Sequence, residues 1–520
     1  SFAISISAAT ARAKPLRQRS DMEKLKILMA ASEAGPFVRT GGLGDVMAAL
    51  PRALAALGHE VKVFLPLYEQ IDGDRYRLRP MERLVAVPHR GEIVEAAVQK
   101  IASRRGGPEH YFVGHDDYFL RPDLYRDPGT GKDFVDNHLR FAFFGRAVLQ
   151  TTKALGWSPD IVHAHDWQAA LIPVYLKAVY ADDPVLNSAR SVLTIHNLGY
   201  QGLFQKDSFT ELGLPDDLFY AMTGALEFFG KVNFLKGGIT LADKISTVSE
   251  RYAREIQAGE EFGFGLEGVL QNRTRDVHGI VNGVDYSVWS PSRDNKIPKK
   301  YGMSNLSGKR TCRVELMNRA GLPQRDRVPL IGLITRLTDQ KGVDLLTEAA
   351  DDIFALDLQM IILGTGDEEY HRKLRQLELK YPDKLKVYLE FNDELAHHIQ
   401  AGADMFLMPS RYEPCGLNQM YALKYGTVPI VREVGGLADT VAEYDPETGQ
   451  GTGFLFREYD SEAMVAALKK ALTVFQGRRK WGKLVKTGMT RDYSWAQSAR
   501  QYTELFEAAR RTEQPAGSHS

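Results

Sequence analysis

The chain has 520 residues, and at roughly 100 to 200 residues per domain this length predicts two or three domains rather than one small module. Hydrophobic residues make up 44% and charged residues 25%, a composition typical of globular proteins that excludes collagen-like and disordered chains. Lys and Arg number 66, Asp and Glu also number 66, and no apolar run approaches the roughly 18 residues of a membrane span, so neither nucleic acid nor a membrane is an expected partner.

The chain contains two cysteines, Cys312 and Cys415. Two cysteines cannot build a disulfide framework, and by themselves they cannot complete a structural zinc site. This count indicates a reducing compartment.

The first residues do not resemble part of a folded domain. The stretch SFAISISAATARAKPLRQRS is rich in Ser, Ala and Arg and has no acidic residue. An organelle transit remnant would have this composition, and an upstream extension of a bacterial protein would explain it equally well. We expect residues 1–21 to form a disordered or targeting-like tail outside the fold.

From Lys24 onward, apolar runs of strand length alternate with amphipathic stretches of helix length, the pattern of parallel βαβ units. The first unit is predicted as a strand at Lys24–Ala31, a helix at Asp45–Leu57 and a strand at Val61–Leu65. The further predicted strands are Asp160–His165, Val192–His196, Lys244–Val248 and Val277–Val281. These elements predict a first Rossmann-like domain over residues 22–290.

A second alternating series follows a polar stretch, Ser290–Leu306, whose Pro, Ser and Lys content is typical of a linker. Its predicted strands are Pro329–Thr335, Gln359–Leu363, Lys386–Phe391, Met405–Met408 and Val428–Val431. They predict a second domain over residues 291–490, then a C-terminal helix at 491–510 that crosses back to the first domain, and a tail at 511–520. The predicted fold class is α/β, with two doubly wound domains facing each other across a cleft.

A glycine-rich connection, Arg39-Thr-Gly-Gly-Leu-Gly-Asp45, follows the first strand and opens a helix. Its glycines allow a close backbone approach, and the free N–H groups of a helix start favour a negatively charged group beside the cation of Arg39. A tight strand-to-helix turn without a ligand remains the alternative.

The second domain supplies matching cations. Arg336 ends the strand PLIGLIT, and Lys341 lies five residues further on at a helix start. Ligands in open α/β sheets bind at the carboxyl ends of strands, where both side chains are expected. Two fixed cations suit a diphosphate, although isolated surface cations would also be ordinary.

Histidines gather in the first domain. His163 and His165 alternate along one strand and project to the same side, with Asp166 just beyond, while His196 and Asn197 end another strand. A metal site is one interpretation, and hydrogen-bonding histidines near a strand end are the other. The strand-terminal position favours contact with a substrate.

The segment Ser410-Arg-Tyr-Glu-Pro-Cys-Gly-Leu417 joins a strand to a helix. Glu413 is expected at the cleft, with the N–H groups of Cys415, Gly416 and Leu417 behind it. A structural alternative is that Glu413 only caps the helix. Cys415 as a covalent nucleophile is a weaker alternative, because no histidine is near it in sequence.

The chain closely resembles the family of bacterial glycogen synthases and plant starch synthases in six motifs that occur in the same order: RTGGLGD, HAHDWQA, TIHNLGYQG, GIVNGVDYSVWSP, TRLTDQKGVD and PSRYEPCGLNQMYALKYGTVPIVREVGGLADT. The resemblance runs from about residue 24 to about residue 506. It implies the two-domain fold of B-type (GT-B) retaining glycosyltransferases, with the acceptor on the N-terminal domain and the nucleotide sugar on the C-terminal domain. The implied reaction moves glucose from ADP-glucose to the non-reducing 4-OH of an α-1,4-glucan, without a metal ion or other cofactor.

The resemblance also implies roles for individual residues. The nucleotide-sugar phosphates would meet Arg39, Thr40, Gly41 and Gly42, with Asp45 supporting that loop, and Arg336 and Lys341 would clamp the diphosphate. The transferred glucose would meet His196, Asp166, Asn197 and Asn282. Glu413 would stabilise the developing positive charge of the sugar, Cys415, Gly416 and Leu417 would contact sugar and phosphate, and Phe391 matches an adenine-stacking position.

Two positions of the chain, 39 and 421, differ from the pattern of the family or of related families. The family usually has Lys where this chain has Arg39, which keeps the charge but replaces a point donor by a planar fork. Related retaining families carry a second Glu eight positions after the first, where this chain has Tyr421, and the synthase family also lacks that Glu. A mechanism with two carboxylates is therefore not expected.

Other hypotheses remain at this point. A catalytically inactive glucan-binding scaffold would keep the fold without needing the cluster of charged residues, and a glucan phosphorylase would need a pyridoxal phosphate lysine, for which no convincing context appears. The expected location is a bacterial cytoplasm, with the plastid stroma as the alternative. We favour the first because no starch-binding or coiled-coil extension accompanies the catalytic portion.

Overall fold

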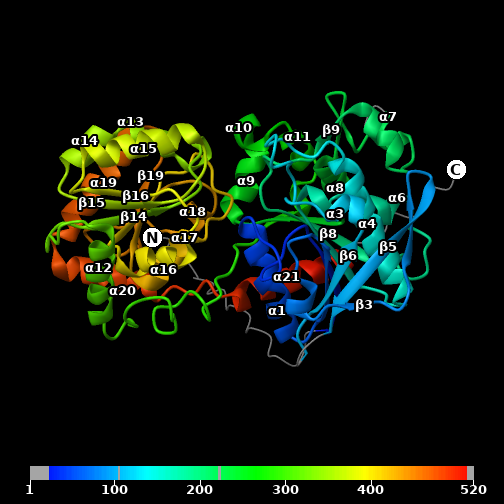
Figure 1. Ribbon diagram of the computed structural model, residues 1–520, viewed down its shortest axis with the longest axis horizontal. Coiled ribbons are helices and arrows are strands. Elements are labelled where there is room, and N and C mark those ends of the chain that lie inside the picture. The colour runs from blue at the N-terminus through cyan, green and yellow to red at the C-terminus, as the bar shows by residue number, and fades with distance from the viewer. Residues whose placement is uncertain (1–22, 103–105, 221–223, 512–520) are drawn as a thin grey trace, which may run out of the picture.

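The computed structural model describes residues 23–102, 106–220 and 224–511, which form two lobes side by side (Figure 1). The predicted tail at 1–21 and residues 512–520 of the second tail lie outside the described residues. Within the described ranges, no helix is both long and apolar enough to cross a membrane.

The N-terminal lobe is built on a sheet whose strand order is β13-β12-β8-β7-β1-β2-β6-β5-β3, with β4 paired to β5. The strands from β13 to β6 run parallel, whereas β5 runs antiparallel to β6, β3 and β4. The bounds are β1 Lys26–Ala30, β2 Glu60–Pro66, β3 Arg79–Pro80, β4 Val85–His89, β5 Glu92–Ile101, β6 Glu109–Gly114, β7 Ile161–His165, β8 Arg190–Ile195, β12 Lys244–Thr247 and β13 Val277–Gly279. The predicted strands match β1, β2, β7, β8, β12 and β13, whereas the parallel strand β6 and the antiparallel edge were not predicted.

Helices cover this sheet, and the lobe also contains a separate small antiparallel sheet in the order β10-β11-β9. Its strands are β9 Leu203–Phe204, β10 Glu227–Phe228 and β11 Lys231–Asn233. The helices are α1 Gly42–Ala56, α2 Gly73–Tyr76, α3 Asp116–Phe119, α4 Asn137–Ala154, α5 Asp166–Ala169, α6 Leu171–Ala178, α7 Asp217–Tyr220, α8 Phe234–Leu241, α9 Glu250–Ala258, α10 Glu260–Gly263 and α11 Glu267–Gln271, with 3₁₀ turns at Lys206–Glu211 and Thr274–Asp276.

The C-terminal lobe contains a fully parallel sheet in the order β16-β15-β14-β17-β18-β19. Its strands are β14 Leu330–Ile334, β15 Gln359–Leu363, β16 Leu385–Tyr388, β17 Met405–Met408, β18 Val428–Arg432 and β19 Phe454–Phe456. Its helices are α12 Ser307–Ala320, α13 Val343–Glu348, α14 Ala350–Ala355, α15 Glu368–Lys380, α16 Asp393–Gly402, α17 Asn418–Tyr425, α18 Gly435–Thr440, α19 Ser461–Phe475 and α20 Arg478–Met489, with a 3₁₀ turn at Asp339–Lys341.

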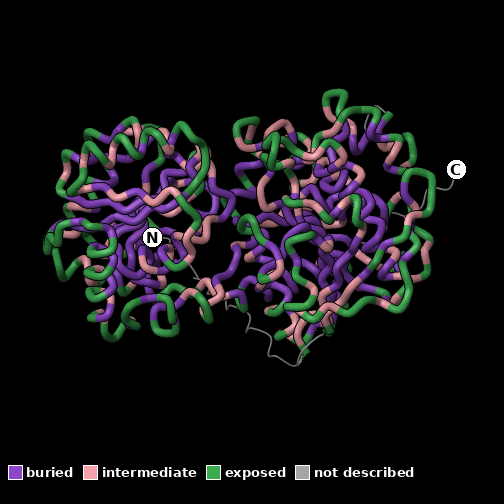
Figure 2. Tube along the Cα trace, viewed as in Figure 1, coloured by how far each residue is buried: buried purple, intermediate pink, exposed green. Residues whose placement is uncertain are grey.

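Both faces of this second sheet are buried. Along β15, Met360 and Ile362 belong to one apolar cluster, whereas Ile361 and Leu363 belong to another. Successive strand residues point to opposite faces, so helices must cover both. Figure 2 shows the result, buried sheets inside each lobe under an exposed outer layer.

The last helix, α21 (Trp495–Arg510), returns to the N-terminal lobe. Its residues Trp495, Tyr502 and Phe506 are buried in the same apolar cluster as the strands of that lobe. Figure 1 shows α21, in red, beside the blue helix α1. The N-terminal core therefore combines residues 25–280 with residues 495–509.

The predicted linker at Ser290–Leu306 is packed rather than loose. Ile297 and Tyr301 are buried in the C-terminal core, and the Tyr301 hydroxyl donates to the carbonyl oxygen of Tyr425 at 2.8 Å. The carboxylate of Asp294 accepts hydrogen bonds from Tyr425 Oη at 2.6 Å and faces His397 Nδ1 at 2.7 Å. The polar composition of the segment predicted a linker, but its polar side chains form hydrogen bonds inside the fold and can therefore be buried.

Candidate active site

The residues singled out in the sequence lie at the carboxyl ends of parallel strands in both lobes. Asp166 directly follows β7, His196 directly follows β8, and Arg336 lies two residues beyond β14. The two edges meet, since Ser249 Oγ of the N-terminal lobe donates to the carbonyl oxygen of Pro414 in the other lobe at 2.6 Å. This edge is where open α/β sheets bind their ligands.

A carboxylate fills the glycine-rich loop. Oε2 of Glu33 accepts hydrogen bonds from the backbone N–H groups of Thr40 at 2.5 Å and Gly41 at 3.3 Å, and Oε1 accepts from the hydroxyl groups of Thr40 and Tyr125, both at 2.7 Å. The sequence interpretation missed Glu33, although its place just after β1 was a signal. A β-carbon on Gly41 or Gly42 would meet no atom within 4 Å, so there is open space beside both glycines.

Arg39 connects the two lobes. Its Nη1 lies 2.9 Å from Oδ1 of Asp45, and its Nη2 lies 3.5 Å from Oδ1 of Asp393, the first residue of α16. Burial raises the pKa of Asp45, and the charge of Arg39 opposes that rise. A β-carbon on Gly44 would lie 2.4 Å from Cβ of Arg39, so only glycine fits there.

Asp166 and His196 form a half-buried polar pair. Asp166 has a positive φ of 56°, and its Oδ1 accepts the backbone N–H of His196 at 2.7 Å. Burial raises the pKa of Asp166 to about 7, and the N–H groups of His196 and Asn197 oppose that rise. Burial lowers the pKa of His196 to about 3, so at neutral pH its imidazole is uncharged.

The other histidines are engaged behind this pair. His165 Nδ1 and His196 Nε2 are 2.9 Å apart, and His163 Nε2 lies 2.6 Å from Oγ1 of Thr194, which in turn lies 2.6 Å from Oγ of Ser246. The structure thus gives both strand histidines hydrogen-bonding partners and places His165 in direct contact with His196.

Lys341 and Glu413 form a nearly buried ion pair. The Lys341 ammonium donates to Oε1 of Glu413 at 2.8 Å and to Oε2 at 2.7 Å, and Ser410 Oγ donates to Oε2 at 3.0 Å. Lys341 lies in the turn before α13 and Glu413 in the loop after β17. Arg336 is exposed, and its Nη2 donates to Oε1 of Gln340 at 3.3 Å. The carboxylate of Glu413 thus fixes the Lys341 ammonium in place for an arriving anion.

Cys415 is a structural thiol in this arrangement. It is buried beside Asn282, the residue that the resemblance placed at the domain junction. Burial raises the pKa of Cys415 to about 12, which disfavours the thiolate that a nucleophile needs. The alternative of a covalent cysteine is therefore not supported.

The loop around Glu413 also reaches the N-terminal lobe. The Tyr412 hydroxyl lies beside Asn197, since a β-carbon on Gly199 would lie 3.2 Å from that hydroxyl and 3.2 Å from Oδ1 of Asn197. Burial raises the pKa of the Tyr412 hydroxyl. Gly416 has a φ of 70°, and Leu417 is the N-cap of α17 without a side-chain cap. Phe391 lies three residues beyond β16 rather than within it, and 80% of its surface is exposed. Its ring is free to stack on a planar group.

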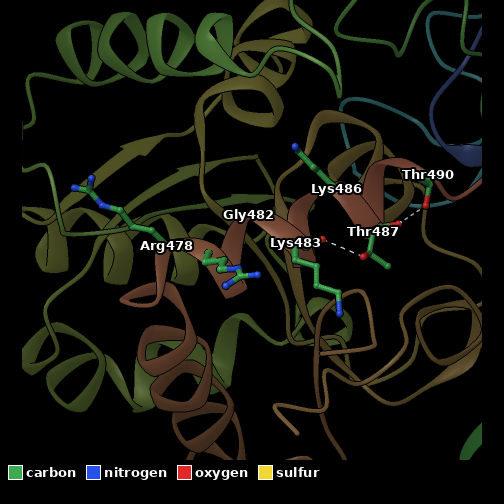
Figure 3. A pocket seen from close by; sticks show the side chains of 7 residues that line it. Arg478, Gly482, Lys483, Lys486, Thr487 and Thr490 are labelled. Atoms are coloured by element: carbon green, nitrogen blue, oxygen red, sulfur yellow. Dashed lines mark hydrogen bonds between the residues drawn. The ribbon is translucent and has the colours of Figure 1, made fainter. Parts of the chain in front are cut away.

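A separate depression of about 530 Å³ runs along α20 on the C-terminal lobe (Figure 3). It is lined by Arg478, Arg479, Gly482, Lys483, Lys486, Thr487 and Thr490. None of the candidate site residues lines it, so this depression is not the candidate active site.

Comparison with known families gives two matches along the chain. The family model described as starch synthase catalytic domain matches residues 26–272, and the one described as glycosyl transferases group 1 matches residues 317–487. Together they cover both lobes.

Curated relatives and solved structures agree with these matches. A glycogen synthase from Koribacter versatilis (strain Ellin345) is 47% identical over 94% of this chain and 99% of its own length, and one from Thermotoga maritima is 43% identical over 93% and 99%. The catalytic domain of starch synthase IV from Arabidopsis thaliana, bound to ADP and acarbose, superposes with a TM-score of 0.85 at 33% identity, covering 94% of this chain and 100% of that one. A sucrose-phosphate synthase from Thermosynechococcus elongatus shares the fold, with a TM-score of 0.58 at 18% identity.

Proposed function

The chain belongs to the family of glycogen and starch synthases, which are GT-B glycosyltransferases, and from this premise we propose how its site residues act on ADP-glucose and a glucan. The enzyme elongates an α-1,4-glucan by transferring glucose to the non-reducing 4-OH with retention of configuration, releasing ADP. The observation that supports our assignment of roles is the junction of the two lobes. Glu413 pairs with Lys341 there, and the next residue, Pro414, accepts a hydrogen bond from Ser249 of the other lobe.

The proposed chemistry places bond breaking and bond making on one face of the sugar. The bond from C1 of glucose to the diphosphate oxygen breaks, the acceptor 4-oxygen bonds to C1, and the 4-OH proton passes to the leaving diphosphate. Lys341 and Arg336 would stabilise the negative charge that develops on the diphosphate. Glu413 would face the positive charge of the sugar, while neutral His196 and Asn197 would orient it.

We propose that the diphosphate is neutralised by these side chains alone, without a metal ion or other cofactor. The remaining site residues would bind the nucleotide sugar: Arg39, Thr40, Gly41, Gly42, Asn282, Phe391 and the backbone N–H groups of Cys415, Gly416 and Leu417, with Asp45 supporting the glycine-rich loop. The similar curated relatives are bacterial, which supports the cytoplasm of a bacterium as the proposed location.

The test offers purified protein ADP-glucose or UDP-glucose with glycogen and follows incorporation of glucose into the polymer, with and without EDTA. We expect incorporation from ADP-glucose that EDTA does not reduce. A requirement for an added divalent cation would overturn the metal-free mechanism. Incorporation from neither donor would favour the inactive scaffold.

A further inference from the structure

Two exposed or half-buried aromatic residues adopt a backbone conformation that aromatic residues avoid. Phe229 and Phe264 both have a φ of 49°, and Phe229 is 85% exposed. A bulky side chain in the left-handed region is a real outlier, costing on the order of 1–3 kcal/mol. Exposing a phenylalanine ring to water adds a further cost. Such a residue at a surface turn indicates a function rather than stability.

The turn that holds Phe229 is fixed by its neighbours. The backbone N–H of Gly230 donates to Oε1 of Glu227 at 2.8 Å, and the Lys236 ammonium donates to the carbonyl oxygens of Gly224, at 3.0 Å, and Glu227. These contacts tie the β10–β11 connection to α8. The ring is therefore presented by a rigid hairpin.

Phe264 is held in a similar way. Its backbone N–H donates to the carbonyl oxygen of Glu260 at 3.0 Å, and its own carbonyl oxygen accepts from Nε2 of Gln201 at 3.0 Å. Its ring packs edge-on against Tyr412 with centroids 5.6 Å apart. Because Tyr412 directly precedes Glu413, Phe264 lies at the border of the reaction centre.

Continuous contacts join the two phenylalanines. The rings of Phe228 and Phe229 meet edge to face at 4.7 Å. A β-carbon on Gly265 would lie 2.9 Å from Cζ of Phe228 and 3.7 Å from Cε2 of Phe229, so both rings lie against the residue that follows Phe264. We call Tyr412, Phe264, Phe228 and Phe229 the aromatic strip.

We propose that the aromatic strip binds the acceptor glucan outside the reaction centre, with sugar rings stacked on it from Tyr412 outward to Phe229. This inference rests on the proposed function. Glucan is an uncharged polymer whose pyranose rings have apolar C–H faces, so rigid aromatic rings can bind them by burying apolar surface. The strip begins beside Glu413, where the chain end must lie, which makes a glucan the occupant that its position favours.

The test is the variant Phe229→Asn, because asparagine tolerates the left-handed conformation but has no ring. We expect an unchanged or higher Tm and an unchanged KM for ADP-glucose, with the KM for maltoheptaose and glycogen raised about threefold to tenfold. Val135→Asn is the matched control, since Val135 is a 92% exposed apolar residue outside the strip. Equal acceptor KM values in wild type and Phe229→Asn would overturn the proposal.

A binding measurement without donor separates this inference from the catalytic assignment. We expect glycogen in a native gel to retard the wild type and the control more than Phe229→Asn. If Phe229→Asn loses retardation although the protein transfers no glucose from ADP-glucose, the strip stands and the proposed function fails. If the variant instead changes only the molecular mass in solution, the strip is a contact between two copies of the chain and the proposal is overturned.

Discussion

At the residue scale, the ion pair between Lys341 and Glu413 couples stability to chemistry. Glu413 is 6% exposed, so removing Lys341 leaves a nearly buried carboxylate without its partner, at a cost of about 3–5 kcal/mol. Removing a charge stabiliser of the transition state typically lowers turnover about 10²-fold. Lys341→Ala is therefore expected to lower both Tm and kcat.

The double variant Lys341→Met/Glu413→Gln separates the two effects. Both charges are gone, so we expect Tm to recover towards the wild-type value while kcat stays at least about 10²-fold low. Thermal unfolding and initial rates on glycogen measure this. A double variant as active as the wild type would show that neither side chain acts in the transfer.

Asp166 predicts a pH dependence of stability. Its pKa is raised by burial to about 7 from an ordinary value of 3.8, so between these values the folded protein holds a proton that the unfolded chain has released. Stability from this residue is thus lost as pH rises towards 7. Asp166→Asn keeps an acceptor oxygen and tolerates the positive φ, but cannot ionise.

We therefore expect the Tm of Asp166→Asn minus that of the wild type to increase from pH 5 to pH 7 and to level off above it. Differential scanning fluorimetry across this range measures the difference, in which the other titrating groups cancel. A difference that is constant with pH would mean that the carboxyl group is ionised throughout.

At the element scale, the start of α18 is fitted against the Glu413 loop. Gly435 has a φ of 43°, and a β-carbon on it would lie 1.9 Å from the carbonyl oxygen of Glu413. Its N–H donates to Oε1 and Oε2 of Glu255 in the other lobe, at 3.2 and 3.1 Å. Only glycine allows this approach.

Gly435→Ala is expected to destabilise the protein by about 1–3 kcal/mol or more and to lower kcat, because the Glu413 loop must move. Gly482→Ala is the matched control: Gly482 lies inside α20, and a β-carbon there meets nothing within 4 Å. Alanine in that helix should add up to about 1 kcal/mol of stability. Chemical denaturation measures both, and an unaffected Gly435→Ala would contradict the close packing.

The bounds of a strand were predictable from the sequence where both faces of that strand are buried. The predicted strands at 359–363 and 405–408 coincide with β15 and β17, because their apolar runs are bounded by polar residues. The predicted strand at 386–391 extended too far, since the run continues through Phe391 after the pairing with β15 has ended. Pairing partners decide where a strand ends, and these lie far away in the sequence.

At the scale of the whole molecule, α21 makes the N-terminal lobe depend on the end of the chain. Phe506 is fully buried in the N-terminal core, so Phe506→Ala is expected to cost about 3–5 kcal/mol. Hydrogen exchange measured by mass spectrometry should show that the variant exchanges faster than the wild type in the strands of the N-terminal lobe, with little change in β14 to β18. Loss of protection confined to the C-terminal lobe would contradict this division of the cores.

The sequence by itself determined the fold class, the family and the edge of the sheets where the motifs gather, because apolar periodicity and motif spacing are local properties of a chain. Only the tertiary structure decided that Glu33 fills the glycine-rich loop, that Lys341 pairs with Glu413, that Cys415 is a buried thiol and that Phe229 belongs to a strip ending at Tyr412. Each of these contacts joins segments that come together only when the sheets pack. Burial and partner identity, which set charge and reactivity, are therefore fixed by packing rather than by neighbouring residues.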